Sequence, residues 1–489
     1  MLRGEAANIR PEMEEAHVMT SRTSRHRPVA VLAALTLAIA ACVGAVAVGP
    51  ASAVSAPVAV SAPASASASA SAAVAAVAPA AAAVAPGSRL VPLKVAPKPV
   101  FKPDAASPTQ PSASSNCGTV RTELTQYAAR HVQRVSCTTI TPGAAHQPKA
   151  APQLGARLVK PLTGSWCGSQ EGIWLYSRTE NCIEGYGITS TTYDTNTRGV
   201  VGTGHFSVNQ DIILSTSSDM FVENDTITWD QITGEEAPGT LEYTAGCTSL
   251  CADVPGSGGI LLPDFSYGQT ATIHLVFEDS PGTVTPDNFT TDYSMGLESP
   301  GILSTNVLNW RMPVTIRCDN LAPRLSPGCV FPASVPQLVL SESTYGAGAA
   351  NVLIGEYYLA GTPGLTTATP LTRGDPTLNQ GNRDAVCDST FVPKPTSVPG
   401  DSCDEYPFAS SQQSGGQRGL TGVNCLEAMP LDVNGTWYAN FQNNYTGTQL
   451  CERGHVPLVQ NSGVGSQLGA LYTNYRMLLG DPYTILVTE

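Results

Sequence analysis

The order of apolar and polar residues predicts several β-strands in the middle of the chain. Four short runs are rich in β-branched and aromatic residues and are bounded by Gly, Pro, Asn or Asp. They span residues 205–216, 270–279, 312–318 and 336–342. Strands that follow one another without intervening helices pack as two face-to-face sheets. We therefore expect a sandwich-like, β-rich domain over residues 160–345.

Two other stretches have helical spacing. In residues 120–135 the apolar side chains recur every three or four positions, at Leu124, Tyr127, Ala128, His131 and Val132. A cysteine stands on each side, so we expect a small disulfide-stapled helix within a segment of residues 116–158. The second helical stretch runs from Gly465 to Met477.

The N-terminal region has the pattern of an export signal. Arg22, Arg25 and Arg27 precede an uncharged, mostly apolar run over residues 28–49, and Ala-Ser-Ala at 51–53 fits a cleavage site. We expect residues 1–53 to be a signal peptide and the protein to be secreted, with no stable membrane partner after cleavage. Two alternatives stay open: an uncleaved membrane anchor and a lipoprotein that carries its lipid on Cys42. The Ala-, Pro- and Ser-rich residues 54–115 are typical of a linker.

The cysteine count supports export. Twelve cysteines follow Cys42, and an even number in an exported chain indicates disulfides. The simplest pairing joins near neighbours, namely 117–137, 167–182, 247–251, 318–329, 387–403 and 425–451. In the last quarter of the chain this pairing joins Cys387 to Cys403 and Cys425 to Cys451. Cys247 and Cys251 could instead form half of a metal site, although no second Cys/His cluster has a matching spacing.

The net charge of the chain limits the partners that its overall surface can attract. The formal net charge is −13, which gives no general attraction to nucleic acid. An anionic substrate would therefore need a divalent cation or a few well-placed Arg and Lys residues.

The last quarter of the chain contains a stretch with candidate chemistry, "CDEYPFASS" at residues 403–411. It places two carboxylates, Asp404 and Glu405, directly after a cysteine. Three further segments follow in order: the glycine patch at 415–416, "VPLVQNSGVGSQLG" at 456–469 and "YRMLLGDPYTILV" at 475–487. Together these segments resemble the NucA/NucB-type secreted deoxyribonuclease domain, which we place at residues 367–489. The β-rich region and the linker lie outside the resemblance.

The resemblance implies a small α+β fold of the ββα-metal type, DNA as the substrate and one divalent cation, Mg²⁺ or Mn²⁺. Asp404 would be the general base, Glu405 its catalytic neighbour and Asn461 the helix-side ligand or orienting group, with Asn461 and Asp404 as metal ligands. Chemistry independent of the resemblance points the same way. A carboxylate can take the proton of the attacking water, and hard cations prefer oxygen ligands.

Neighbouring residues on a strand point to opposite faces of a sheet. We therefore expect Asp404 to face the cleft and Glu405 to brace the hairpin. A Cys387–Cys403 bridge would fix the start of this strand. His455 is an alternative base in the same region, and Arg418, Arg453 and Arg476 are candidates for phosphate binding or for a solvated surface.

A second functional hypothesis is a non-catalytic extracellular binding or adhesion protein with a degenerate nuclease-like domain. In it, the β-rich region would bind a ligand whose nature the sequence does not indicate. Residues 380–489 hold five Lys/Arg against ten Asp/Glu, and residues 464–477 contain no carboxylate, which favours this hypothesis. Residues 420–452, which include Cys425 and Cys451, look like an insertion. The intact "CDEYPFASS" stretch opposes the hypothesis.

Overall fold

The computed structural model describes residues 90–95, 103–106, 117–140, 167–322 and 325–489. All of them belong to one compact unit of the chain, Ser71–Glu489. The predicted signal peptide, Cys42, the apolar run at 28–49 and most of the linker lie outside the described residues. Among the residues described, no helix is both long enough and apolar enough to span a membrane.

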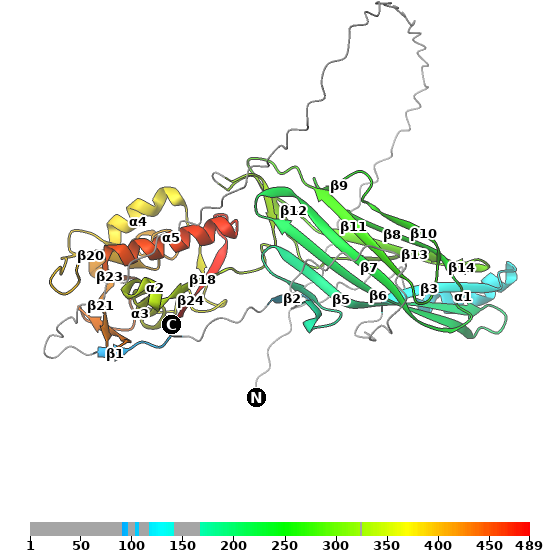
Figure 1. Ribbon diagram of the computed structural model, residues 1–489, viewed down its shortest axis with the longest axis horizontal. Helices are drawn as coiled ribbons and strands as arrows, with labels where there is room; N and C mark the ends of the chain where they lie inside the picture. The colour runs from blue at the N-terminus through cyan, green and yellow to red at the C-terminus, as the bar shows by residue number, and fades with distance from the viewer. Residues whose placement is uncertain (1–89, 96–102, 107–116, 141–166, 323–324) are drawn as a thin grey trace, which may run out of the picture. The chain divides into compact units, whose positions relative to one another are not determined.

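Within the described residues, two large sheets build the β-rich region, and their strands are antiparallel except for the parallel pair of β14 and β3 (Figure 1). The first has the order β14-β3-β5-β6-β7-β11-β9, with β4 beside β5 and β2 beside β4, and the second has the order β10-β8-β13-β15. A smaller sheet has the order β12-β16-β17. The strands are β2 (Asp104–Ala106), β3 (Arg134–Ile140), β4 (Trp174–Tyr176), β5 (Glu180–Asp194), β6 (Val200–Ser215), β7 (Ser218–Gly234), β8 (Gly239–Cys247), β9 (Ala252–Asp253), β10 (Gly259–Phe265), β11 (Thr270–Glu278), β12 (Asp287–Phe289), β13 (Thr291–Glu298), β14 (Ile302–Ser304), β15 (Leu308–Arg311), β16 (Ile316–Asp319) and β17 (Gly328–Val330).

Side chains from the two large sheets share one hydrophobic core. Phe206 of β6 and Trp229 of β7 are fully buried with Tyr243 of β8 and Trp310 of β15. Because alternate strand residues point the same way, the long strands β6 and β7 each contribute a row of such residues. Each fully buried aromatic side chain contributes about 1.5–3 kcal/mol to folding. The expected β-rich, sandwich-like region is present. Three of the four strands predicted from the sequence match β6, β11 and β18 (Gln337–Ser341) closely, although β18 belongs to the C-terminal domain and not to the β-rich region.

The stapled helix is shorter than its sequence pattern predicted. Helix α1 (Cys117–Ala129) ends before His131, which adopts a positive φ of 61°. A left-handed residue of this kind terminates a helix. The β-branched run that follows becomes strand β3, and the Cys117–Cys137 disulfide joins the two elements.

All six near-neighbour disulfide pairs are confirmed. In the C-terminal part of the chain, Cys387 is bonded to Cys403 and Cys425 is bonded to Cys451. Cys247 and Cys251 are bonded to each other, so the alternative of a metal half-site at this position is wrong.

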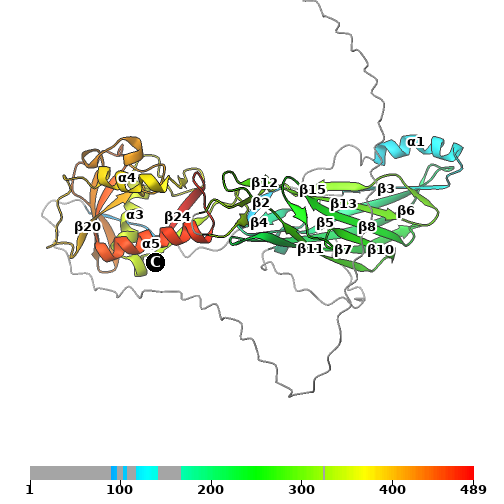
Figure 2. The same cartoon turned by 90° about the horizontal axis from the view of Figure 1, so that it is seen from above.

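Within the described residues, the C-terminal domain combines two sheets with four α-helices. A five-stranded sheet has the order β1-β22-β21-β23-β20, and a three-stranded sheet has the order β18-β24-β19. The strands are β1 (Leu90–Pro92), β18 (Gln337–Ser341), β19 (Leu371–Thr372), β20 (Asp401–Tyr406), β21 (Leu426–Val433), β22 (Thr436–Phe441), β23 (Glu452–Pro457) and β24 (Pro482–Thr488). The helices are α2 (Glu342–Tyr345), α3 (Ala347–Tyr358), α4 (Asn379–Val386) and α5 (Leu458–Asn474). Figure 2 gives a second view of α3, α4, α5 and β20.

The interval that looked like an insertion is part of the five-stranded sheet. Residues 420–452 contain β21 and β22, which pair with each other, and β21 also pairs in parallel with β23. The Cys425–Cys451 disulfide lies just before β21 and β23, and both cysteines are buried beside Val386 of α4. This bridge therefore ties the starts of two neighbouring strands together, and the interval is an integral part of the sheet.

Helix α3 is the centre of this domain's core. Ten of its residues, from Ala347 to Glu356, are buried. It contacts β20, β21 and β23 of one sheet, β24 of the other, and α5. At Gly348 the two helices come so close that an added Cβ would lie 2.9 Å from a methyl carbon of Val464. Small residues therefore allow α3 to fill the space between its neighbours.

The domain extends beyond the boundary of residue 367 expected from the sequence. Strand β18 pairs with β24 in parallel, and α3 fills the core, yet both precede that residue. Strand β1 comes from the segment expected to be linker and pairs with β22. Residues 367–489 therefore lack three of the elements that complete the domain.

Helix α5 begins at Leu458, seven residues before the predicted start at Gly465. Strand β23 ends at Pro457, so the strand leads directly into the helix. Pro457 stands at the N-cap position and has an extended backbone, with a ψ of 130°. Asn461 is therefore the fourth residue of the helix and does not cap it.

Candidate active site

The pairing of β20 with β23 sorts the candidate residues onto two faces. Asp404 lies opposite Gly454, and Glu405 lies opposite Arg453. Because side chains alternate along a strand, Asp404 faces helix α3 and Glu405 faces helix α4. Hydrogen bonds confirm this arrangement, since Asp404 accepts from Asn351 of α3 and Glu405 accepts from Arg383 of α4.

The Asp404 face is a buried, oxygen-rich cluster. The Nδ2 group of Asn351 donates to Oδ2 of Asp404 at 3.2 Å. This approach requires a glycine at position 454, where an added Cβ would lie 1.8 Å from Oδ1 of Asn351. Glu452 of β23 is fully buried nearby. Within the described residues, Oδ1 of Asn351 and both carboxylate oxygens of Glu452 have no hydrogen-bond partner.

Burial governs the acidity of this cluster. It raises the pKa of Asp404 well above its usual range, and the negative charge of Glu405 adds to the effect, while the hydrogen bond from Asn351 opposes it. The pKa of Glu452 is also raised well above its usual range, first by burial and then by Asp404. Both groups favour the neutral form because their charges are removed from water.

The Glu405 face carries charged pairs. Nε of Arg383 donates to Oε1 of Glu405 at 3.2 Å. Burial raises the pKa of Glu405, although the charge of Arg383 and its hydrogen bond act against this rise. The Glu405 side chain is only 7% exposed, whereas that of Arg383 is 53% exposed. The carboxylate is therefore buried beneath a guanidinium group that reaches solvent.

His455 lies on the same face and is enclosed by acids. Its Nδ1 is 2.8 Å from Oδ2 of Asp401, and its Nε2 is 3.2 Å from Oε1 of Glu427. Its ring stacks on Phe391, and its side chain is fully buried. Because both of its ring nitrogens already bond carboxylates, His455 is poorly placed to act as the alternative base.

Arg453 also belongs to this network and does not reach solvent. It is 5% exposed and bonds Glu427 at 2.6 Å through Nη2, and Asp388 at 3.3 Å through Nη1. Burial acts to raise the pKa of Glu427, but hydrogen bonds from His455 and Arg453 hold it below its usual value. The prediction that Arg453 binds phosphate is therefore wrong, because the N–H groups of its guanidinium already donate to protein acceptors.

The other predicted phosphate ligands lie apart from these clusters. Arg476 is fully buried, and its guanidinium group bonds the Asp319 carboxylate at 2.9 Å and the carbonyl oxygens of Thr216 and Ser326. It cannot bind DNA in this state, so the prediction for Arg476 is also wrong. Arg418 is exposed and donates to the carbonyl oxygen of Leu450.

Asn461 lies beside the first residues of β20. Its Nδ2 group donates to the carbonyl oxygen of Cys403 at 3.0 Å and to Oγ of Ser402 at 3.2 Å. Because the amide nitrogen makes both bonds, the carbonyl oxygen Oδ1 is the atom of Asn461 that could bind a cation. The helix-side residue predicted from the sequence is thus adjacent to the strand that carries Asp404.

Several residues of the two faces were missed in the sequence. Asn351 lies in α3, upstream of the segments that carry the family resemblance. Glu452 follows Cys451, and Glu427 lies in the interval that looked like an insertion. Arg383 lies in "NRDAVC" at residues 382–387, about 20 positions before the carboxylate pair.

A second buried acidic cluster lies in the core of the β-rich region. Glu223 and Asp225 of β7 are fully buried, and burial raises the pKa of both. Gln210 donates to Glu223, and the Tyr243 hydroxyl donates to Asp225 at 2.5 Å. These bonds join β6, β7 and β8, so the cluster links the two sheets from inside.

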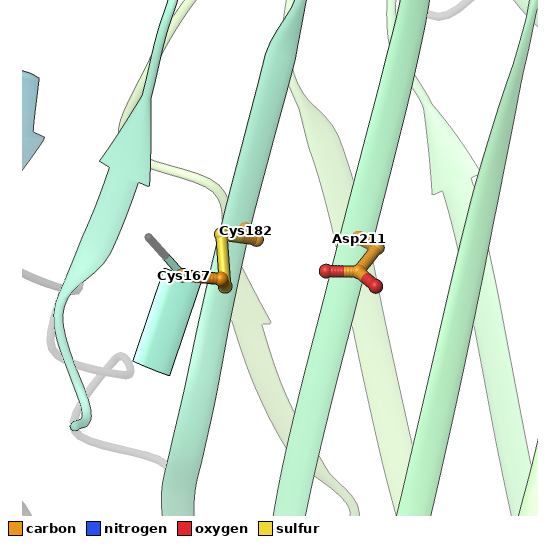
Figure 3. A group of neighbouring side chains, drawn as sticks. All are labelled: Cys167, Cys182 and Asp211. Atoms are coloured by element: carbon orange, nitrogen blue, oxygen red, sulfur yellow. A yellow bond between two sulfur atoms is a disulfide. The ribbon is translucent and has the colours of Figure 1, made fainter. Parts of the chain in front are cut away.

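One further group has the composition of a metal site but not its chemistry. The ligand atoms of Cys167, Cys182 and Asp211 lie within 4.8 Å of one another. Figure 3 shows that the two sulfur atoms are bonded to each other, with Asp211 on the neighbouring strand. Disulfide sulfurs are not thiolates and do not provide the ligands that a metal requires.

Comparison with known proteins assigns the family. Residues 361–486 match the family model described as deoxyribonuclease NucA/NucB, so the C-terminal part of the chain is a deoxyribonuclease-family domain. The resemblance seen in the sequence is thereby confirmed.

Other comparisons add little. No curated protein matches the chain. Two crystal structures of Salmonella alpha-2-macroglobulin, one of a mutant and one reacted with methylamine, match at 11% and 13% identity, with TM-scores of 0.16 and 0.15. Each match covers 29% of this chain and 9% of the other protein, so this chain spans under a tenth of that length.

Proposed function

We propose that the C-terminal domain hydrolyses phosphodiester bonds of DNA as a metal-dependent, non-specific endonuclease. The family match over residues 361–486 is the observation that carries this proposal. The Asp404–Glu405 pair lies inside that match. The proposed ββα-metal unit would consist of β20, its antiparallel partner β23 and α5, which begins directly after β23, with β21 and β22 inserted between the two strands in the chain.

The residues around Asp404 fit a hard divalent cation such as Mg²⁺ or Mn²⁺. Such ions prefer oxygen ligands. Oδ1 of Asn351 and the two carboxylate oxygens of Glu452 are buried and without partners within the described residues, and they would hold the cation together with Asp404. Asn461 could add its Oδ1 from the side of α5. When bound, the cation would act as a Lewis acid toward a phosphate oxygen.

Asp404 is the proposed general base. A base works best when its pKa lies near the working pH, and burial moves the pKa of Asp404 upward from the usual range of carboxyl groups. The neighbouring Asn351 amide favours the ionised form and orients it. Glu405 points to the opposite face and therefore does not share this task.

We also propose that the protein is exported, as its N-terminal sequence predicts. Six disulfides support this proposal, because such bonds persist in oxidising compartments.

Nicking of supercoiled plasmid by the full chain tests the proposed activity. We expect cleavage with Mg²⁺ or Mn²⁺ and none with EDTA. Asp404→Asn keeps the shape but cannot accept a proton, and should slow cleavage by about 10²–10⁴-fold. Asp432→Asn, at the far end of β21, is the matched control. Asn461→Ala should raise the Mg²⁺ concentration required.

Circular dichroism must show that each variant remains folded. A folded wild-type chain that leaves the plasmid intact with either metal would contradict the endonuclease function. A folded Asp404→Asn variant that cuts at the wild-type rate would instead refute the role of Asp404 alone.

A further inference from the structure

A nuclease must bind the phosphate backbone of its substrate, yet the C-terminal domain is poor in cations. Residues 361–489 contain six Lys or Arg residues, at positions 373, 383, 394, 418, 453 and 476. The identity of the phosphate-binding residue therefore depends on which of these side chains has free donors.

Four of the six cations are already committed to protein acceptors. Arg453 and Arg476 are buried in ion pairs. Arg373 is partly buried, stacks on the Tyr472 ring and donates to the carbonyl oxygen of Met477. Lys394 donates to Gln442, with Glu427 3.9 Å away. These contacts leave Arg383 and Arg418 as the two exposed candidates among the six. Lys94, which follows β1, is also exposed, but β1 lies at the opposite edge of the five-stranded sheet from β20.

Arg383 differs from Arg418 in its position relative to the carboxylate pair. Its Nε is bound to Glu405, and its positive charge acts to lower the pKa of both Glu405 and Asp404. Within the described part of the chain, neither Nη group of Arg383 makes a hydrogen bond. The guanidinium group is thus oriented by one nitrogen and can offer the other two to a ligand.

The backbone beneath Arg383 is also fixed. The adjacent Asn382 is 6% exposed, donates to the carbonyl oxygen of Ala409 at 2.8 Å and accepts from Gln417 at 3.2 Å. These bonds hold α4 against the segment that follows β20. Arg383 therefore projects from a rigid helix, beside the strand that carries both carboxylates.

We propose that Arg383 binds a backbone phosphate of the DNA substrate and that Glu405 is a positioning residue that orients it. This inference rests on the proposed function. A guanidinium group can use one edge for a carboxylate and its remaining donors for a phosphate oxygen, which the point charge of a lysine cannot do with fixed geometry. The adjacent carboxylates thereby have separate roles, Asp404 toward the reaction and Glu405 toward the substrate.

The test measures duplex binding separately from cleavage, with the full chain. The affinity for a fluorescent duplex oligonucleotide is measured by anisotropy in EDTA over a range of salt concentrations. Loss of one phosphate contact reduces the slope of log K against log salt by about 0.9. Arg383→Gln should show this change and weaken binding about 10-fold or more, and it should raise the KM for cleavage in Mg²⁺ more than it lowers kcat.

Three matched variants define the role. Arg121→Gln, an exposed arginine of α1, removes the same charge and should leave the slope unchanged. Arg383→Lys should keep the slope but bind more weakly than wild type. Glu405→Gln should raise KM while retaining part of the slope, because Arg383 remains but loses its orientation.

The inference is overturned if Arg383→Gln keeps the wild-type slope and KM, or if Arg418→Gln shows the predicted losses in its place. It is also overturned if the wild-type chain binds no duplex at any salt concentration. A chain that binds DNA through Arg383 but does not cut it would refute the endonuclease proposal and leave this inference standing.

Discussion

Glu356 offers a quantitative test of the C-terminal domain's core. This residue lies in α3 and is 1% exposed, and its Oε1 has no hydrogen-bond partner within the described residues. Burial raises its pKa from 4.5 to about 8. The substitution Glu356→Gln has nearly the same shape but is neutral at every pH.

The sign and size of the effect follow from this pKa. When a group has a higher pKa in the folded state than in the unfolded state, its stabilising contribution is fully present at pH values below the unfolded-state pKa. That stability falls as the pH rises and levels off above about 8. The pKa lies about 3.5 pH units above the solvated value, and each unit corresponds to about 1.4 kcal/mol. Ionisation therefore costs the wild-type domain about 5 kcal/mol at pH 9.

Scanning calorimetry of the full chain at pH 5 and pH 9 measures this difference. At pH 5 the Glu356→Gln variant should unfold at nearly the wild-type temperature. At pH 9 the transition of the C-terminal domain should rise by about 10–20 °C, since 1 kcal/mol shifts a domain of this size by about 2–4 °C. Glu278→Gln, an exposed residue of β11, is the control. An equal shift at both pH values, or none at pH 9, would refute the reasoning.

Three further predictions concern packing. Gly355→Ala should destabilise the domain strongly, because the added Cβ would lie 2.1 Å from a ring carbon of Tyr406. Gly469→Ala in α5 meets no atom within 4 Å and should raise the free energy of unfolding by about 0.5–1 kcal/mol. Urea unfolding that ranks the two variants alike would contradict this. Replacing Cys387 and Cys403 by serine should cost about 3 kcal/mol, measured in the same way, and an unchanged midpoint would exclude a stabilising role for the bridge. A fragment of residues 367–489 should lack cooperative unfolding because α3 and β18 are missing, and a sharp transition in that fragment would show that these elements are dispensable.

Local patterns in the sequence predicted local structure well. The six disulfides close short loops, so near-neighbour pairing was the simplest expectation. Alternation along β20 correctly placed Asp404 and Glu405 on opposite faces. The family resemblance rested on segments close together in the chain, and these segments fold into one domain.

The remaining features depend on contacts that the sequence pattern does not encode. Helix α3 is buried on all sides, so its run of small and apolar residues has no polar face that would indicate a helix. Strand β1 has three residues inside an Ala- and Pro-rich stretch, and its partner lies about 350 positions later. Arg476 looked like an exposed cation, because nothing in its neighbourhood predicted the buried Asp319 that binds it.

The parallel pairing of β18 with β24 also determines when the domain can become complete. Gln337 lies opposite Thr484, so almost 150 residues must be synthesised after β18 before its partner exists. Until then the apolar side chains of β18 and α3 have no cover from Tyr483, Ile485 and Val487. A ribosome-bound chain that stops short of β24 therefore cannot close the core beneath Asp404. Assembly of the candidate catalytic centre is thus a late event in biosynthesis, and loop closure over this distance is a slow step in folding.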